Sequence, residues 1–155
     1  EFPNLGIAVA GYPEVHQEAP CADIDLDNLK RKVDCGADIV LTQLFYRTED
    51  YFDFCDRCVI AGITVPIVPG ILPVINLAQI QRITSMCGAK LPRTFVDRLG
   101  ERCDDDDWQF KVGVEFATAQ VSELLATGAP GVHFYVLNKS QVTAEVLTQV
   151  GWSCE

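Results

Sequence analysis

The segment Ala37–Tyr46 has the sequence ADIVLTQLFY and decides the fold. It follows the turn at Gly36 and consists of apolar and β-branched residues that end in one amide, Gln43, and two aromatics. Such a run is typical of a strand that is buried on both faces, as in a parallel sheet covered by helices. The carboxyl end of such a strand is where α/β barrels and doubly wound sheets bind ligands. Gln43 is therefore a candidate ligand contact, and the alternative is an amide that hydrogen-bonds a neighbouring loop.

The rest of the chain repeats a strand-then-helix pattern. We predict strands at Gly6–Ala10, Ile39–Phe45, Val65–Val68 and Val132–Leu137. We predict helices at Asp25–Val33, Thr48–Ala61, 77–87, Leu91–Leu99, Trp108–Thr127 and from Ser140 to Gly151. Thr48, Asn76 and Ser140 are the expected N-caps, and Gly36 is an expected C-cap. The acidic run Cys103–Asp107 is interpreted as a solvated turn or as the acidic start of the next helix.

Four strand–helix units fit two architectures. One is a small open α/β sheet, and the other is half of an eight-stranded α/β barrel. The chain has no Gly-rich phosphate loop of the Rossmann or P-loop kind, so the open sheet would lack its usual chemistry. We expect an α/β fold of four βα units, with residues 1–155 forming a single domain, and both architectures stay open at this point.

Composition excludes several classes of protein. The chain has 155 residues, 48% of them hydrophobic and 22% charged, as in ordinary globular domains. The net charge of −10 argues against a nucleic-acid partner, which would need a basic face. No apolar run approaches the ~18 residues of a membrane span, and no signal peptide is visible. We expect a cytoplasmic protein that does not associate with membranes.

The seven cysteines do not form a recognisable framework. Their odd number argues against a secreted disulfide scaffold. Cys55 and Cys58 form a CxxC pair, but they lie in a stretch with helical spacing, and the only histidines are His16 and His133. A zinc site needs four closely spaced ligands. We expect reduced thiols on a helix face and no metal site.

Polar residues of chemical interest follow the predicted strands, where a sheet holds binding loops. They occur in the segments Gly11–His16, Gln43–Tyr46, Pro69–Pro73 and Asn138–Lys139. The segment Asn28–Lys32 places amide and cationic groups on the first helix. Arg and Lys suit a phosphate group, although a Lys-Arg-Lys run is more often a solvated face.

Five blocks of the sequence together resemble the carboxyl-terminal half of the catalytic domain of the methylenetetrahydrofolate reductase family. They occur in the family's order over nearly the whole chain. The blocks are AGYPEVH at 10–16, LKRKVD at 29–34, TQLF at 42–45, IVPGILP at 67–73 and HFYVLN at 133–138.

The resemblance implies a flavoprotein oxidoreductase of one-carbon metabolism on an eight-stranded α/β barrel. The four βα units of this chain would correspond to the second half of that (β/α)8 barrel. Such an enzyme uses NADH or NADPH to reduce FAD and then reduces 5,10-methylenetetrahydrofolate to 5-methyltetrahydrofolate. By residue-wise correspondence, the implied FAD contacts are Tyr12, His16, Asp25, Asn28, Arg31 and Lys32. The implied contacts to the folate substrate are Gln43, Gln79 and Lys139, and Gln43 would also meet the nicotinamide.

The chain departs from the family pattern in three ways. Lys139 stands where many relatives have Arg, and Ile83 stands where some have an aromatic residue. The family's catalytic glutamate belongs to the amino-terminal half of the barrel, and neither Glu1 nor Glu14 replaces it. We therefore predict no catalytic residue in this chain and little or no activity for it alone.

Two further interpretations stay open at this point. One is a non-catalytic half-barrel that self-associates or binds a partner chain, and we expect a homo-oligomer. The other is an unrelated barrel enzyme that binds a phosphorylated substrate at Arg31 and Lys32.

Overall fold

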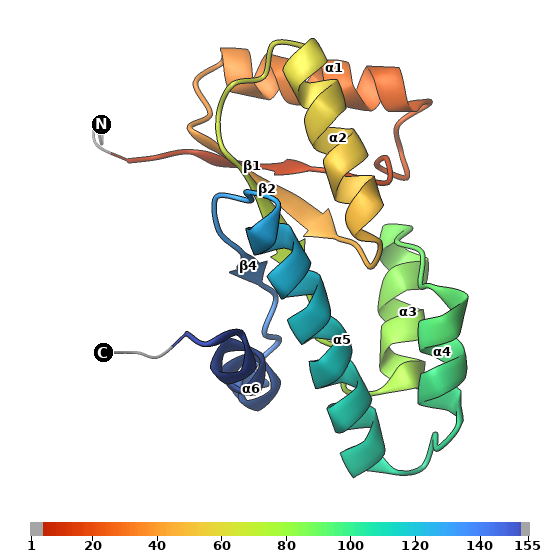
Figure 1. Cartoon of the computed structure of the whole chain (residues 1–155). Helices are drawn as coiled ribbons and strands as arrows, with labels where there is room; N and C mark the ends of the chain where they lie inside the picture. Colours follow the sequence, from red (N-terminus) through yellow and green to blue (C-terminus); the bar gives the residue numbers. More distant parts are fainter. Residues whose placement is uncertain (1–4, 153–155) are drawn as a thin grey trace.

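The computed structural model describes residues 5–152 and contains a four-stranded parallel sheet with six helices (Figure 1). The strands are β1 (Ala8–Gly11), β2 (Ile39–Leu44), β3 (Ile67–Ile71) and β4 (His133–Phe134). The helices are α1 (Ala22–Asp34), α2 (Thr48–Ile60), α3 (Leu77–Cys87), α4 (Arg93–Gly100), α5 (Asp106–Ala126) and α6 (Ser140–Val150). The strands lie in sequence order, β1-β2-β3-β4, and every neighbouring pair is parallel. The predicted α/β class and the four strand–helix units are confirmed.

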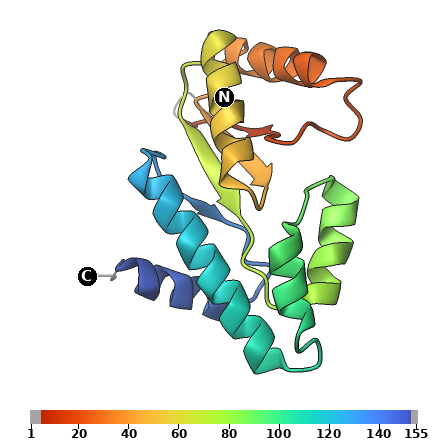
Figure 2. The same ribbon diagram turned by 45° about the vertical axis from the view of Figure 1, so that its right-hand side comes forward.

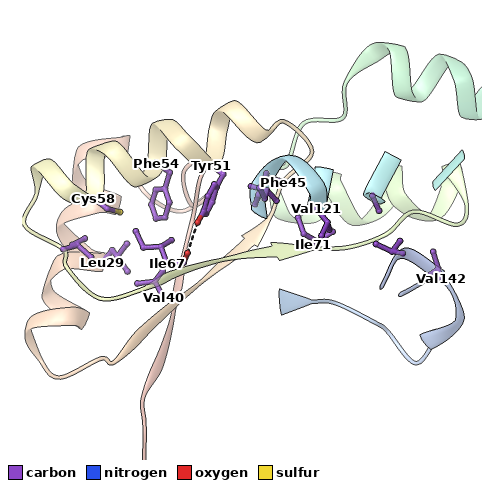
Figure 3. Close-up of a cluster of buried hydrophobic side chains, with 14 of the residues drawn as sticks. Leu29, Val40, Phe45, Tyr51, Phe54, Cys58, Ile67, Ile71, Val121 and Val142 are labelled. Atoms are coloured by element: carbon purple, nitrogen blue, oxygen red, sulfur yellow. Dashed lines mark hydrogen bonds between the residues drawn. The ribbon is translucent and has the colours of Figure 1, made fainter. Parts of the chain in front are cut away.

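The helices α1, α2, α5 and α6 pack on one face of the sheet. The main core lies between them and the strands and includes Leu29, Val40, Ile67, Val121 and Val146. Figure 3 shows this cluster and the hydroxyl of Tyr51, which donates to the carbonyl of Ile67 at 2.8 Å. Burial of this apolar surface is the main force that holds the layers together.

The prediction that β2 is buried on both faces is wrong for this chain. Val40, Thr42 and Leu44 are buried, whereas the alternate residues Ile39, Leu41 and Gln43 are partly exposed. Successive side chains of a strand point to opposite faces, and the helices that form the main core cover only one of them.

The strand boundaries differ from the predictions. β1 runs from Ala8 to Gly11 instead of Gly6–Ala10, β2 ends at Leu44 instead of Phe45, and β3 and β4 differ most. β3 begins at Ile67 and continues through Pro69 and Gly70, which we had interpreted as a loop. Pro69 is tolerated because the β2–β3 register shifts there, and the Gly70 amide donates to the Thr42 hydroxyl at 2.8 Å. β4 is only two residues long.

Some helix caps also differ from the predictions. Asn76 caps α3 as expected, accepting from the Gln79 amide at 2.9 Å. Thr48 and Ser140 are instead the first residues of their helices, and the Thr48 hydroxyl donates to Glu123. Gly36 lies one residue beyond the C-cap of α1.

The acidic run spans an exposed turn and the start of α5. Cys103 and Asp104 lie in the turn, and Asp105 is the N-cap, whose side chain accepts from the Trp108 amide at 2.9 Å. Asp106 and Asp107 occupy the first turn of α5, where the helix dipole favours acids, and the helix begins two residues before its predicted boundary at Trp108. Both interpretations of the run are therefore confirmed, each for part of it.

The pair α3–α4 forms a second, smaller core beyond the end of β3, against α5 (Figure 2). The fully buried amide of Gln109 joins all three helices: it accepts from Leu77 and donates to the carbonyls of Leu99 and Arg102. Gly113 lets α5 approach the chain before α3 closely, because a Cβ at this position would lie 1.6 Å from the carbonyl oxygen of Val74. These contacts fix α3 relative to the sheet.

Among the described residues, no helix is long and apolar enough to cross a membrane.

Candidate functional site

The loop between β1 and α1 carries an aromatic pair next to a cation. The rings of Tyr12 and His16 meet edge to face, with centroids 4.5 Å apart. The ammonium of Lys32 lies 6.0 Å from the Tyr12 ring centroid and donates to the carbonyl of Ala10 at 2.6 Å. The carboxylate of Asp25 accepts from the His16 amide at 2.9 Å. The fold thus brings together four of the six predicted cofactor contacts.

The hydrogen bonds of the loop set the chemical state of its side chains. His16 Nδ1 accepts from the Glu18 amide at 3.1 Å, so a neutral imidazole carries its proton on Nε2 and can donate there. Burial lowers the pKa of Lys32, while the nearby Asp25 opposes that shift. Burial, followed by the charges of Asp25 and Glu18, raises the pKa of Tyr12.

The remaining predicted cofactor contacts lie on α1. Asn28 and Arg31 are exposed, and residues 25, 28 and 32 follow the helical spacing that places side chains on one face. Arg31 follows Asn28 by three residues and extends this polar strip. Asp25, Asn28, Arg31 and Lys32 therefore form a polar strip along α1, with Arg31 and Lys32 as its two cations, that extends from Tyr12 and His16.

Gln43 lies where β2 approaches its carboxyl end, beneath the β1–α1 loop. Its side-chain oxygen accepts from the Leu44 amide at 2.9 Å. The residue lines a small pocket together with Tyr12, Glu14 and Cys87. The structure thus places Gln43 next to the loop that carries the aromatic pair.

Gln79 and Lys139 line a second pocket, between α3 and the segment after β4. Its other walls are mainly apolar and include Leu72, Ile80, Ile83, Tyr135 and Val142. The pocket therefore combines an apolar wall with two exposed polar side chains.

Tyr135 forms the floor of this region and ties β4 to β2. Its hydroxyl donates to the carbonyl of Thr42 at 2.8 Å, and burial raises its pKa. A Cβ at Gly70 would lie 2.7 Å from the Tyr135 ring and 2.2 Å from the Thr42 oxygen. Only glycine at position 70 allows this crossing, so the PG pair in the predicted ligand loop has a packing role.

Beyond β4 the backbone adopts a strained conformation at the cavity rim. Leu137 and Asn138 have φ values of 47° and 62°, so an extended strand cannot reach the predicted boundary at Leu137. The left-handed region is unfavourable for a residue such as Leu and is often found at functional sites. The turn places Lys139 beside the cavity.

The family model for methylenetetrahydrofolate reductase matches residues 1–151. The chain belongs to the methylenetetrahydrofolate reductase family. It is 41% identical over 151 residues to the 5,10-methylenetetrahydrofolate reductase of Escherichia coli K12, covering 97% of this chain and 51% of that protein. It is 38% identical over 156 residues to the methylenetetrahydrofolate reductase (NADH) 1 of Zea mays, covering 95% of this chain and 26% of that protein. The chain thus spans about half the length of its bacterial relative and a quarter of the plant one.

A solved structure shares the fold. It is an uncharacterized protein from Clostridium thermocellum, described as binding two copies of 5-methyl-5,6,7,8-tetrahydrofolic acid. The TM-score is 0.60 at 18% sequence identity, and the match covers 95% of this chain and 53% of that one. Membership of the reductase family confirms the resemblance seen in the sequence and removes the unrelated barrel enzyme from consideration.

The sequence did not indicate which residues hold the segments of the candidate site together. Glu14, Gln17 and Tyr135 all make contacts with residues far away in the sequence. Glu14 and Tyr135 fell within the family blocks, but their partners follow from how the units pack. A single sequence carries no signal for such pairs.

The CxxC pair lies on α2 as two free thiols. Cys58 is fully buried, and burial raises its pKa to about 12. Burial also raises the pKa of Cys55. Within residues 5–152, no group of three or more His, Cys, Asp or Glu side chains is placed to hold a metal ion.

Proposed function

We propose that this chain forms the carboxyl-terminal half of a flavin-dependent (β/α)8 barrel that reduces 5,10-methylenetetrahydrofolate with NADH or NADPH. The observation that carries the proposal is that the predicted FAD contacts and Gln43 adjoin one loop. In this chain, which belongs to the reductase family, Gln79 and Lys139 line the neighbouring pocket between α3 and the segment after β4. The sequential parallel strand order is that of a barrel, and the partly exposed face of β2 would be the barrel interior.

The chemistry of the donor set fits FAD. Arg31 can meet a diphosphate through its planar fork, and Lys32 can meet it as a point charge. Asn28 supplies an amide on the same helix, and His16 can donate from Nε2. When bound, the flavin would accept a hydride from the pyridine nucleotide and pass it to the folate.

The folate side rests on groups that recognise a pterin and an acidic tail. Gln43 offers the NH2 donor of its amide to the edge of a pterin, while its side-chain oxygen accepts from the Leu44 amide. Lys139 can attract a tail carboxylate, although without the two-point geometry of an Arg. Ile83 contributes packing at the cavity wall where some relatives would stack an aromatic ring.

The catalytic acid of the family would come from the amino-terminal half of the barrel. The residues of this chain would therefore bind and orient the two ligands and keep water from the reaction. In this proposal the reductase activity belongs to the intact protein that contains this chain.

The test of the proposal is flavin retention by the intact protein. Purified protein should show the absorption spectrum of a bound flavin and should bind 5-methyltetrahydrofolate. Arg31→Ala should weaken FAD binding by about 1.5–3 kcal/mol, because it removes a charge-assisted contact. Arg93→Ala is the matched control, since the Arg93 side chain is 93% exposed and pairs only with Asp97 among the described residues. Protein without flavin, or equal FAD affinity in both variants, would contradict the proposal.

A further inference from the structure

The β1–α1 loop is joined to the end of α3 by the side chain of Glu14. Its two carboxylate oxygens accept from the backbone amide of Lys90 at 3.0 and 3.2 Å, and the side chain is only 8% exposed. The Lys90 ammonium is 3.9 Å away, and that side chain is 78% exposed. The amide, rather than the ammonium, is therefore the main partner, because an exposed ion pair contributes little.

A second contact lies beside the first. The Gln17 amide, in the orientation that satisfies its neighbours, donates to the carbonyl of Met86 and accepts from the amide of Gly88 at 2.7 Å. Gly88 ends α3 with φ of 79°, and a Cβ there would lie 3.0 Å from the Gln17 side chain. Glu14 and Gln17 thus hold consecutive parts of the same turn.

The loop between these contacts is under strain. Val15 has φ of 76°, an outlier for a β-branched residue. Such a conformation persists only when the surroundings enforce it. The Pro13 carbonyl is also held, because it accepts from Arg57 at 3.0 Å. The loop therefore has a fixed shape that depends on its anchors.

We propose that Glu14 is a positioning residue that clamps the β1–α1 loop to the α3–α4 connection. The clamp fixes the roof of the pocket at Gln43, by which we mean the loop residues and the end of α3 that cover it. The cavity that Gln43 lines is bounded on the loop side by Tyr12 and Glu14 and on the α3 side by Cys87 and Ala89. These two sides are the segments that Glu14 joins. The inference rests on the proposed function, since it assigns this roof to a ligand held at Gln43.

The clamp also links the two halves of the proposed site. The loop carries Tyr12 and His16 on the flavin side, and α3 carries Gln79 on the folate side. A carboxylate between them fixes their spacing. Glu14 does not contact reacting atoms in this proposal and does not substitute for the family's catalytic glutamate.

The test compares four variants of the intact protein by amide hydrogen exchange and folate kinetics. Glu14→Ala should raise the exchange rate of the Lys90 amide by on the order of tenfold or more, because it removes the acceptor of that amide. Glu14→Gln retains an oxygen acceptor and should restore protection. Lys90→Ala removes the ammonium but keeps the amide, so it should behave as the unmodified protein. Glu18→Ala removes the same charge from the same loop, where its carboxylate makes no described hydrogen bond, and is the matched control.

The kinetics should separate positioning from catalysis. Glu14→Ala should raise KM for methylenetetrahydrofolate several-fold while kcat changes less, because a roof contact stabilises ground and transition states alike. Glu14→Gln should restore KM. Unchanged exchange in Glu14→Ala would overturn the clamp, and faster exchange with an unchanged KM would overturn its role over Gln43. An intact protein that binds no folate would refute the proposed function instead, and the exchange rates alone would still decide the clamp.

Discussion

Gln43 is the residue on which the folate side of the proposal depends. Its oxygen is already engaged by the Leu44 amide, so its NH2 group is the part left for a ligand. A substitution that removes the NH2 donor of Gln43 therefore tests ligand binding more directly than one that removes the oxygen.

We therefore predict that Gln43→Glu impairs folate reduction more than it impairs flavin binding. The substitution replaces the NH2 donor by a charge in a half-buried position and would leave the pterin mispaired, at a cost of about 1–3 kcal/mol in kcat/KM. Steady-state kinetics with methylenetetrahydrofolate, alongside the flavin spectrum, measure both. Gln81→Glu, at an exposed position on α3, should leave both unchanged. Folate kinetics that match those of the unmodified protein would exclude Gln43 from the site.

The cysteines give a second prediction at this scale. With a pKa of about 12, Cys58 carries on the order of a thousandfold less thiolate at pH 8 than an ordinary thiol. Cys21, Cys35 and Cys103 are exposed. Alkylation of the native protein followed by peptide mass analysis should modify these three well before Cys55 and Cys58. Rapid labelling of Cys58 without unfolding would contradict the packing of α2.

Among the helices, α3 and α4 depend most on a single buried amide. From α5, Gln109 satisfies one backbone donor in α3, one backbone acceptor in α4 and a second acceptor in the turn after α4. No apolar side chain of similar size can replace these bonds, so the groups would remain buried and unpaired.

We expect Gln109→Leu to lower the free energy of unfolding by about 2–4 kcal/mol. Urea denaturation of both variants measures it, with Gln141→Leu on the exposed surface of α6 as the control. A change below 1 kcal/mol would mean that water or rearranged backbone replaces the amide.

The elements also show which features a single sequence can predict. Apolar runs and caps such as Asn76 located every helix and the β2 strand, because these signals are local. The ends of β3 and β4 were missed because they depend on neighbours: the Thr42 hydroxyl replaces a ladder bond at Gly70, and Tyr135 bridges to β2. The site residues came from the family resemblance, whereas the Glu14 contact with Lys90 required the fold.

For the whole molecule, the sheet leaves two outer strands. Within residues 5–152, β1 pairs only with β2, and β4 pairs only with β3. Ala8 and Ala10 of β1 are exposed, as is the nearby Ile7. Unpaired edges with apolar neighbours favour pairing with another strand.

We predict that the isolated chain self-associates and that salt promotes association. A net charge of −10 opposes the approach of two copies at low ionic strength, and salt screens that repulsion. Sedimentation velocity across protein concentration, at low and high salt, measures the effect. A monomer that unfolds cooperatively and binds no hydrophobic dye would show that the chain closes its own edges and would count against the half-barrel.

The spacing of the strands along the chain has a consequence for the order of folding. β1, β2 and β3 are each separated by one helix, whereas α3, α4 and α5 all intervene between β3 and β4. Closing that longer loop costs more chain entropy. The strand pairing that it forms is short, since β4 has two residues and pairs Gly70 with His133 at its start. The first three strands should therefore assemble early, with β4 and α6 docking last and opening first in hydrogen exchange. The cavity that holds Lys139 would then be completed only in the final step of folding.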